Sequence, residues 1–265
     1  MDNAPIRIIQ ISDMHLFSDP ESVLLGIKTQ ESFQAVLELL QQEAERMDLI
    51  LLTGDLSQDG SNASYVRLAS MMKKLHVPVY CVPGNHDNTK IMNHVYPLET
   101  ISNLRHIILK NWHLILLDSQ KPGAVEGYLD HSQLNYLRQC LQTYPEHEAI
   151  VVLHHHPLSV GSRWLDNLGL KNAEEFWSII SQYPKMNTIL FGHIHQEHEQ
   201  MINGISCYST PSTCVQFMRK QDKFGLEKLP AAYRWINLYE DGHLETAIKR
   251  VANYIGIFDA NAKGY

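Results

Sequence analysis

The chain has 265 residues, 44% of them apolar, which is enough for one large α/β domain with a full core. Its 22 Lys and Arg residues stand against 29 Asp and Glu residues, a formal net charge of −7. The lack of clustered Lys and Arg disfavours DNA or RNA as the main partner, so attraction for a phosphate must be local, as at a metal site.

Cysteine usage and the N-terminus indicate the compartment. The four cysteines lie far apart without CxxC spacing, which favours reduced thiols over a zinc knuckle or a disulfide framework. The N-terminus lacks the basic stretch and apolar core of a signal peptide, and no run approaches the ~18 apolar residues of a membrane span. We therefore expect a cytoplasmic protein with no membrane partner.

The first part of the chain alternates strands and helices. Apolar, β-branched runs predict strands at residues 6–11, 49–52 and 77–82. Helical spacing of apolar residues predicts helices from Thr29, as N-cap, to about Met47 and over residues 65–75. Polar side chains follow each strand's carboxyl end, where open α/β sheets place their sites.

The later part of the chain is more mixed. Residues 107–109 and 113–117 are predicted as adjacent strands, 131–141 and 172–181 as helices, and 149–153 and 188–191 as buried strands. Asn203-Gly204 and Asp241-Gly242 predict hairpins. Without repeats or a linker, the sequence favours a single domain over residues 1–265 with a strand-rich C-terminal part from about residue 201.

Five short segments carry oxygen and imidazole groups, each at the end of an apolar run or after one. They are Asp13-Met14-His15, Gly54-Asp55, Gly84-Asn85-His86-Asp87, His154-His155-His156-Pro157 and Gly192-His193-Ile194-His195. This mixture of donors, without thiolates, suits divalent Mn, Fe or Zn. A single Asp-x-His pair is common by chance, but the ordered set of five predicts two divalent metal ions in one site.

Spacing suggests how the donors are shared. On an extended segment Asp13 and His15 point to one side and can hold the same ion, and His193 and His195 share this spacing. Asp55 follows a glycine, which frees the backbone to turn so that its carboxylate bridges two ions. Such a pair of ions, with two carboxylates and a bridging hydroxide, leaves a net charge of roughly +1 that attracts a phosphodiester for in-line attack by the hydroxide.

The histidine triplet leaves a choice open. If residues 151–155 stay extended, alternate side chains face opposite ways, so at most one of His154 and His155 points at the metals without a bend. His156 precedes Pro157 and is confined to extended backbone.

In identity and order, the five segments resemble the motifs of the calcineurin-like metallophosphoesterase family over residues 6 to about 197. Finer segments at residues 25–32, 164–173 and 209–217 are similar to bacterial class III 3′,5′-cyclic-AMP phosphodiesterases. The resemblance implies an α/β fold, a four-layer αββα sandwich of two mixed sheets flanked by helices. It also implies hydrolysis of 3′,5′-cyclic AMP to 5′-AMP, with a small cyclic nucleotide as the partner.

The resemblance further implies the metal ligands. One metal takes Asp13, His15 and His195, the second takes Asn85, His155 and His193, and Asp55 bridges the two. His155 is chosen because the family's ligand stands two residues before the proline.

The residue after Asn85 is implied as the catalytic one. His86 steadies the transition state or protonates the leaving oxygen, and Asp87 orients it. The residues implied to contact the substrate are Asn85, His86 and His195.

Several points stay open at this stage. Other functions are a hydrolase of other phosphodiesters, nucleotide pyrophosphates or phosphomonoesters, and a non-catalytic scaffold, which the complete ligand set disfavours. Tryptophans are more often core residues, and only Trp164, in the loop after the histidines, is a candidate to line a substrate pocket. The strand-rich tail from Met201 onward offers an edge for a homodimer.

Overall fold

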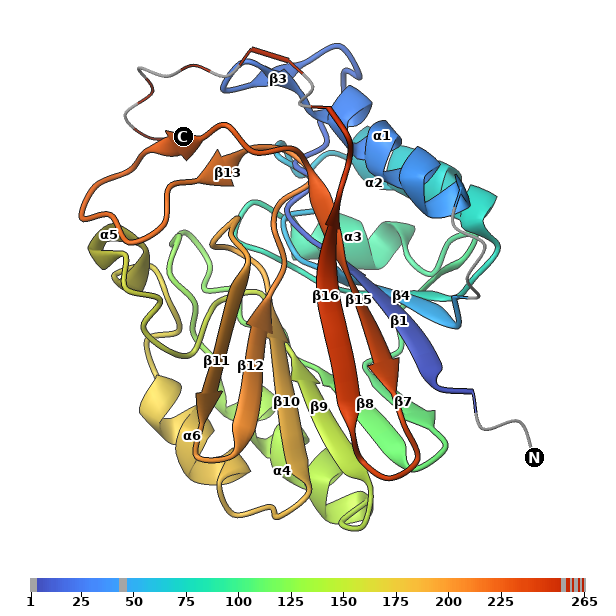
Figure 1. The fold of residues 1–265 in the computed structure, drawn as a ribbon, viewed down its shortest axis with the longest axis vertical. Coiled ribbons are helices and arrows are strands. Elements are labelled where there is room, and N and C mark those ends of the chain that lie inside the picture. Colours follow the sequence, from blue (N-terminus) through green and yellow to red (C-terminus); the bar gives the residue numbers. More distant parts are fainter. Residues whose placement is uncertain are drawn as a thin grey trace.

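The computed structural model describes residues 4–42, 47–253, 256–257, 259, 262 and 264. Two six-stranded sheets dominate this part of the chain and pack face to face (Figure 1). In spatial order, the first sheet contains β16 (Leu244–Arg250), β15 (Ala232–Leu238), β1 (Ile6–Ile11), β4 (Leu49–Thr53), β5 (Val79–Val82) and β6 (Ile101–Ser102). The second contains β11 (His198–Ile202), β12 (Ile205–Ser209), β10 (Met186–Phe191), β9 (Glu148–Val152), β8 (Trp112–Leu116) and β7 (His106–Leu109).

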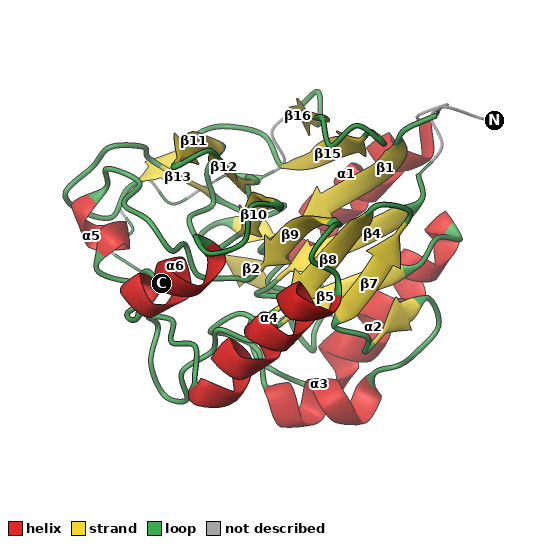
Figure 2. Ribbon diagram, turned by 90° about the horizontal axis from the view of Figure 1, so that it is seen from below, coloured by secondary structure: helices red, strands yellow, loops and turns green. Residues whose placement is uncertain are grey.

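Helices lie outside the two sheets, as Figure 2 shows. They are α1 (Thr29–Gln42), α2 (Asn62–Met72), the 3₁₀ turn η1 (Lys73–Leu75), α3 (Thr89–Val95), α4 (His131–Thr143), α5 (Arg163–Asp166) and α6 (Ala173–Ile180). Two short hairpins complete the described elements: β2 (Val23–Leu24) with β3 (Ile27–Lys28), and β13 (Gln216–Phe217) with β14 (Leu226–Glu227). Every described helix is too short or too polar to cross a bilayer.

The structure has four layers: helices, the first sheet, the second sheet and helices again. Three apolar cores lie between them. In β1, Ile8 packs between the two sheets, whereas its neighbour Ile9 packs under the helices that cover the first sheet. In β9, Ile150 faces the first sheet and Val151 faces the helices that cover the second. Successive side chains of a strand point to opposite faces, so strands that are apolar throughout are buried on both sides. The predicted four-layer α/β sandwich is confirmed.

Strand directions bring the site together. β1, β4 and β5 are parallel neighbours, and so are β8, β9, β10 and β12. The carboxyl ends of parallel strands meet at one edge of a sheet. The loops after these strands therefore meet where the two sheets face each other.

The predicted elements match most of the described structure. The strand at residues 6–11 and the hairpins at Asn203-Gly204 and Asp241-Gly242 are confirmed. Thr29 is the first residue of α1 rather than a cap before it, and α1 is described to Gln42, because residues 43–46 lie outside the described part. The sequence analysis predicted neither α3 nor the hairpin of β2 and β3.

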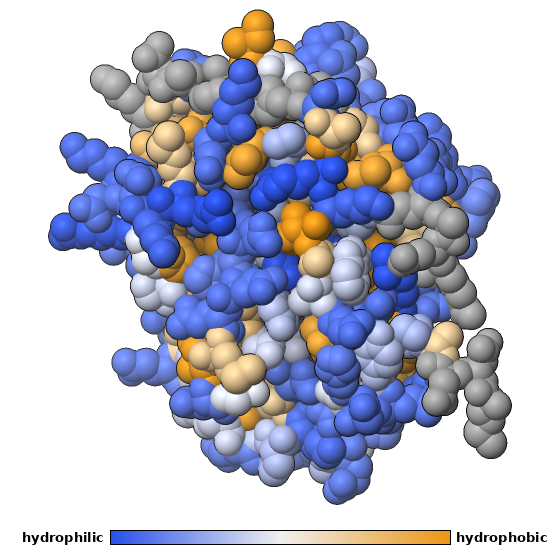
Figure 3. All heavy atoms as spheres, in the orientation of Figure 1, coloured by the Kyte–Doolittle hydropathy of each residue, from blue (hydrophilic) through white to orange (hydrophobic). Residues whose placement is uncertain are grey.

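The face of the molecule seen in Figure 3 carries small apolar areas scattered among polar ones. Met201 in the edge strand β11 is 71% exposed, yet Glu199 and Gln200 beside it are also exposed. Charged residues on an edge strand discourage pairing with another chain. The homodimer edge therefore stays a prediction.

Candidate metal centre

The five segments of the sequence meet at the carboxyl ends of the strands. Asp13 and His15 follow β1, and their backbone N–H groups donate to the carbonyls of Gly54 and Asp55 after β4, at 3.0 and 2.9 Å. His193 follows β10, and its backbone N–H donates to both carboxylate oxygens of Asp13 at 3.2 Å. Ligand-type residues from both sheets are thus tied together through the backbone.

The backbone at these positions is unusual. Five of the seven predicted ligands have φ between 49° and 68°: Asp13, His15, Asp55, His193 and His195. Left-handed backbone is uncommon outside glycine, although Asp and His are enriched there. The expectation of extended geometry at Asp-x-His and His-x-His is therefore wrong, and the left-handed turns aim the side chains instead.

A first group contains Asp13, His15 and His195, whose donor atoms lie within 4.8 Å of one another. His195 Nε2 lies 3.3 Å from Asp13 Oδ1 and 3.2 Å from His15 Nε2. The Nδ1 atoms of these histidines lie 2.6 Å from Gln58 Oε1 and 2.9 Å from the Val215 carbonyl. An acceptor at Nδ1 fixes the tautomer and leaves the Nε2 lone pair for a metal.

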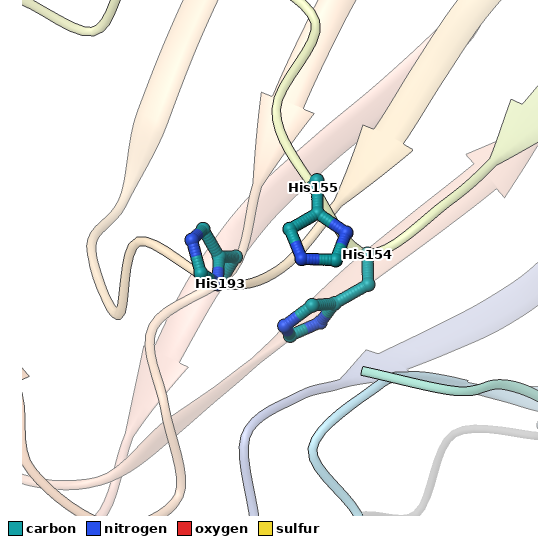
Figure 4. Close-up of side chains that lie close together, drawn as sticks. All are labelled: His154, His155 and His193. Carbon is teal, nitrogen blue, oxygen red and sulfur yellow. The ribbon is translucent and has the colours of Figure 1, made fainter. Parts of the chain in front are cut away.

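A second group contains His154, His155 and His193. Figure 4 shows His154 and His155 on the segment after β9 and His193 on the loop after β10, with the three rings close together. The His155 and His193 ring centroids are 4.8 Å apart, and those of His154 and His193 are 5.0 Å apart. His193 and His195 thus fall in different groups, contrary to the spacing argument but in line with the resemblance.

Asp55 lies between the two groups. One carboxylate oxygen, Oδ2, is 3.3 Å from His154 Nε2 and 3.8 Å from His15 Nε2. The other, Oδ1, accepts the backbone N–H of His86 at 2.9 Å. This position is the one that a bridging carboxylate requires.

The structure bears on the choice within the histidine triplet. His154 Nδ1 lies 2.8 Å from the Thr53 carbonyl, which turns Nε2 toward Asn85 Oδ1 at 3.2 Å and toward Asp55. Both ring nitrogens of His155 have other partners, Ser119 Oγ at 2.8 Å and the Val125 carbonyl at 3.0 Å. The geometry favours His154, not His155, as the ligand beside Asn85 and Asp55. The assignment to His155 therefore stays a prediction, with His154 as the better-placed alternative.

This alternative gives a direct prediction. His154→Ala should lose one of two bound metal equivalents, because its Nε2 faces both the bridge and Asn85. His155→Ala should keep both ions and lower the melting temperature, because it breaks contacts to Ser119 and Val125. Elemental analysis with thermal melting measures both effects. Loss of an ion from His155→Ala alone would support the assignment to His155.

The charge states of the site suit a cation. Burial lowers the pKa of His15 to about 3 and holds the pKa values of His155 and His193 well below their usual range. Burial also lowers the pKa of His154, but Asp55, Asp13 and the Thr53 carbonyl together outweigh it and raise that pKa to about 9. Neutral imidazole is the form that binds metals, and a cation beside Asp55 can take the place of the His154 proton.

Unpaired buried atoms support the same reading. Both ring nitrogens of His193 are buried and have no hydrogen-bond partner among the described residues, and Oδ2 of Asp55 has only its ion-pair contacts with His154 and His15. A buried polar atom without a partner costs about 1–3 kcal/mol. Metal coordination removes this cost, so the residues present fit a pair of divalent ions.

The other predicted site residues divide into two kinds. Asn85 and His86 are half-buried, and the His86 ring lies 5.1 Å from that of His15, within reach of a substrate. His195 is fully buried with Nε2 toward Asp13, which favours its metal role over its predicted substrate contact.

The hydrogen bonds of Asp87 go to neighbouring loops, and its role in orienting His86 stays a prediction. Its carboxylate accepts the backbone N–H groups of Gly84, Leu56 and Ser57 at 2.8–3.1 Å and the Tyr65 hydroxyl at 3.0 Å. It therefore ties the loop after β5 to the loop after β4.

Sequence reasoning missed the residues that hold the ligands. Gln58 and Ser119 contact His15 and His155, and Gln120 donates to the Gly84 and Asp87 carbonyls at 2.8 and 2.6 Å. Their one sequence signal is their place in the chain, since Gln58 closely follows Gly54-Asp55 and Ser119 follows the carboxyl end of β8. Common polar residue types in loops carry no further signal.

Comparisons with known proteins agree with this geometry. The model of the calcineurin-like phosphoesterase family matches residues 6–197. The 3′,5′-cyclic adenosine monophosphate phosphodiesterase CpdA of Pseudomonas aeruginosa is 40% identical, covering 99% of this chain and 96% of that protein. The CpdA of Vibrio vulnificus is 42% identical, covering 98% and 95%. A dimetal phosphatase from Danio rerio shares the fold, with a TM-score of 0.67 at 14% identity, covering 94% of this chain and 100% of that one.

Proposed function

Because the chain belongs to the calcineurin-like phosphoesterase family, we propose that it hydrolyses 3′,5′-cyclic AMP to 5′-AMP with two divalent metal ions. The observation that carries this proposal is the pair of buried donor groups on either side of Asp55. Near full-length similarity to proteins named as 3′,5′-cyclic-AMP phosphodiesterases supports the substrate.

The chain's own residues divide the work of the site. Asp13, His15 and His195 would hold one ion, Asn85, His154 and His193 would hold the other, and Asp55 is placed between them. Once bound, the ions supply Lewis acidity at the phosphate and a nucleophile at neutral pH. Donors of oxygen and imidazole type suit iron, manganese or zinc.

His86 is the residue placed to act on the leaving group. Its backbone is fixed by Asp55, and its half-buried ring borders both His15 and the cavity next to His193. A ring in this place can hold a proton near the leaving oxygen without binding metal. The small cyclic substrate also agrees with the net charge of −7, which disfavours a polyanion.

Metal dependence and substrate choice test the proposal. Chelation should abolish hydrolysis, because the ions would supply both the Lewis acid and the nucleophile, and Mn or Fe should restore it. The reconstituted enzyme is then assayed on 3′,5′-cAMP, 2′,3′-cAMP, bis(p-nitrophenyl) phosphate and p-nitrophenyl phosphate. The highest kcat/KM is expected on 3′,5′-cAMP.

Two outcomes of this assay contradict the proposal. Full activity with less than one equivalent of any transition metal would exclude the metal mechanism. A monoester as the best substrate would replace the proposed reaction with phosphomonoester hydrolysis.

A further inference from the structure

A cavity of about 260 Å³ lies beside the metal centre. His86 and His193 form its inner wall, and its outer wall includes Trp164 of α5 with Phe217 and Phe224 of the β13–β14 hairpin. Figure 1 shows α5 and β13 on the same side of the molecule. The volume is just below the range of about 300–1,000 Å³ typical of ligand pockets. It suits one small group rather than a long chain.

The three aromatic residues form a packed cluster, which we call the aromatic wall. The Trp164 ring meets Phe217 and Phe224 edge-on, with centroids 5.2 and 5.3 Å apart, and the two phenylalanines are 5.5 Å apart. Phe217 also stacks on the ring of His195 at 4.1 Å with an interplanar angle of 9°. The aromatic wall is therefore preformed and continuous with the metal centre.

One polar atom in this wall has no partner. The indole nitrogen of Trp164 is buried, and no described residue accepts a hydrogen bond from it. An indole N–H is a donor only, and buried tryptophan N–H groups usually have an acceptor. The described lining contains no Lys, Arg, Asp or Glu, so the cavity offers nothing for a second phosphate.

We propose that this cavity holds the purine base of the nucleotide and that the Trp164 N–H donates to an unprotonated ring nitrogen of that base. The inference rests on the proposed function, which places the phosphate at the metals. A purine offers a flat face to the aromatic wall, and base–aromatic contacts add affinity for any base. Its ring nitrogens supply the acceptor that Trp164 lacks.

Binding of two product-like ligands tests the proposal. The phosphates of 5′-AMP and ribose 5-phosphate are expected to sit alike at the metals, but only 5′-AMP has a base. In the Mn-reconstituted enzyme, Trp164→Phe should raise the Kd of 5′-AMP by about 3–10-fold, the effect of losing one neutral hydrogen bond. The Kd of ribose 5-phosphate should change less than about twofold, within the usual effect of a remote surface change.

Trp164→Ala removes the packing surface of the ring together with the hydrogen bond. It should raise the Kd of 5′-AMP by at least about tenfold, because contact with the ring is lost as well. Trp235→Phe is the matched control, since Trp235 lies on β15 under Arg7, and both Kd values should stay as in the parent protein. Isothermal titration calorimetry measures all three variants.

The outcomes separate this inference from the proposed function. Equal losses for 5′-AMP and ribose 5-phosphate in Trp164→Phe, or no loss for either, would overturn the base pocket while leaving cyclic AMP hydrolysis in place. Trp164-dependent binding of 5′-AMP in a protein that does not hydrolyse 3′,5′-cAMP would overturn the proposed function alone.

Discussion

Asp55→Ala is expected to release both metal ions and to lower kcat/KM for 3′,5′-cyclic AMP by at least roughly a thousandfold. Loss of an outer partner of a metal ligand typically costs 10–100-fold, and a ligand shared by two ions has a larger effect. The Asp55 carboxylate is the group that lies between both donor sets, 3.3 Å from His154 and 3.8 Å from His15. Without this carboxylate, the negative charge that would reduce the repulsion between the two cations is also lost.

Metal content and rate are measured together in this experiment. Asp241→Ala is the control, because Asp241 is an exposed aspartate that accepts the His243 backbone N–H at 2.9 Å in a distant hairpin. The control should keep two ions and the parent rate. An Asp55→Ala protein with two ions and an unchanged rate would show that Asp55 does not bridge.

His86→Asn is expected to keep both ions while kcat for 3′,5′-cAMP falls by at least roughly a hundredfold, since a positioned general acid contributes about 10²–10⁴-fold. The ring borders the cavity and the His15 ring, and the backbone N–H that binds Asp55 is retained in the variant. A group that acts on the transition state lowers kcat more than it raises KM.

A second substrate identifies what His86 does. The loss should shrink for bis(p-nitrophenyl) phosphate, because nitrophenolate departs without needing a proton. Equal losses on both diesters indicate electrostatic stabilisation of the transition state instead of leaving-group protonation. Unchanged kcat on both would remove His86 from the mechanism.

The strands and hairpins were predictable because their signals are local. Runs rich in isoleucine, such as β1, are buried on both faces, and Asn203-Gly204 and Asp241-Gly242 form hairpin turns. Helix α3 gave no such signal, since it has seven residues and Met92 is its one buried residue. A helix that short shows no apolar periodicity.

The site was predictable in its residue types but not in every position. The five segments come together, because each follows a parallel strand. The choice of His155 counted residues back from Pro157, and that count could not show that the Thr53 carbonyl turns the ring of His154 toward Asp55 and Asn85. The family resemblance gave Asp87 the role of orienting His86. The hydrogen bonds from the Gly84, Leu56 and Ser57 backbone to Asp87 could not be predicted from the sequence.

The left-handed backbone at the proposed ligand positions lowers the stability of the fold at the same residues that the proposed metal site needs. Left-handed backbone costs roughly 1–2 kcal/mol for an ordinary L-residue, and glycine avoids most of this cost. Three of the positions are histidines: His15, His193 and His195. Glycine at one of these three positions is therefore expected to stabilise the metal-free fold while it removes a proposed metal ligand.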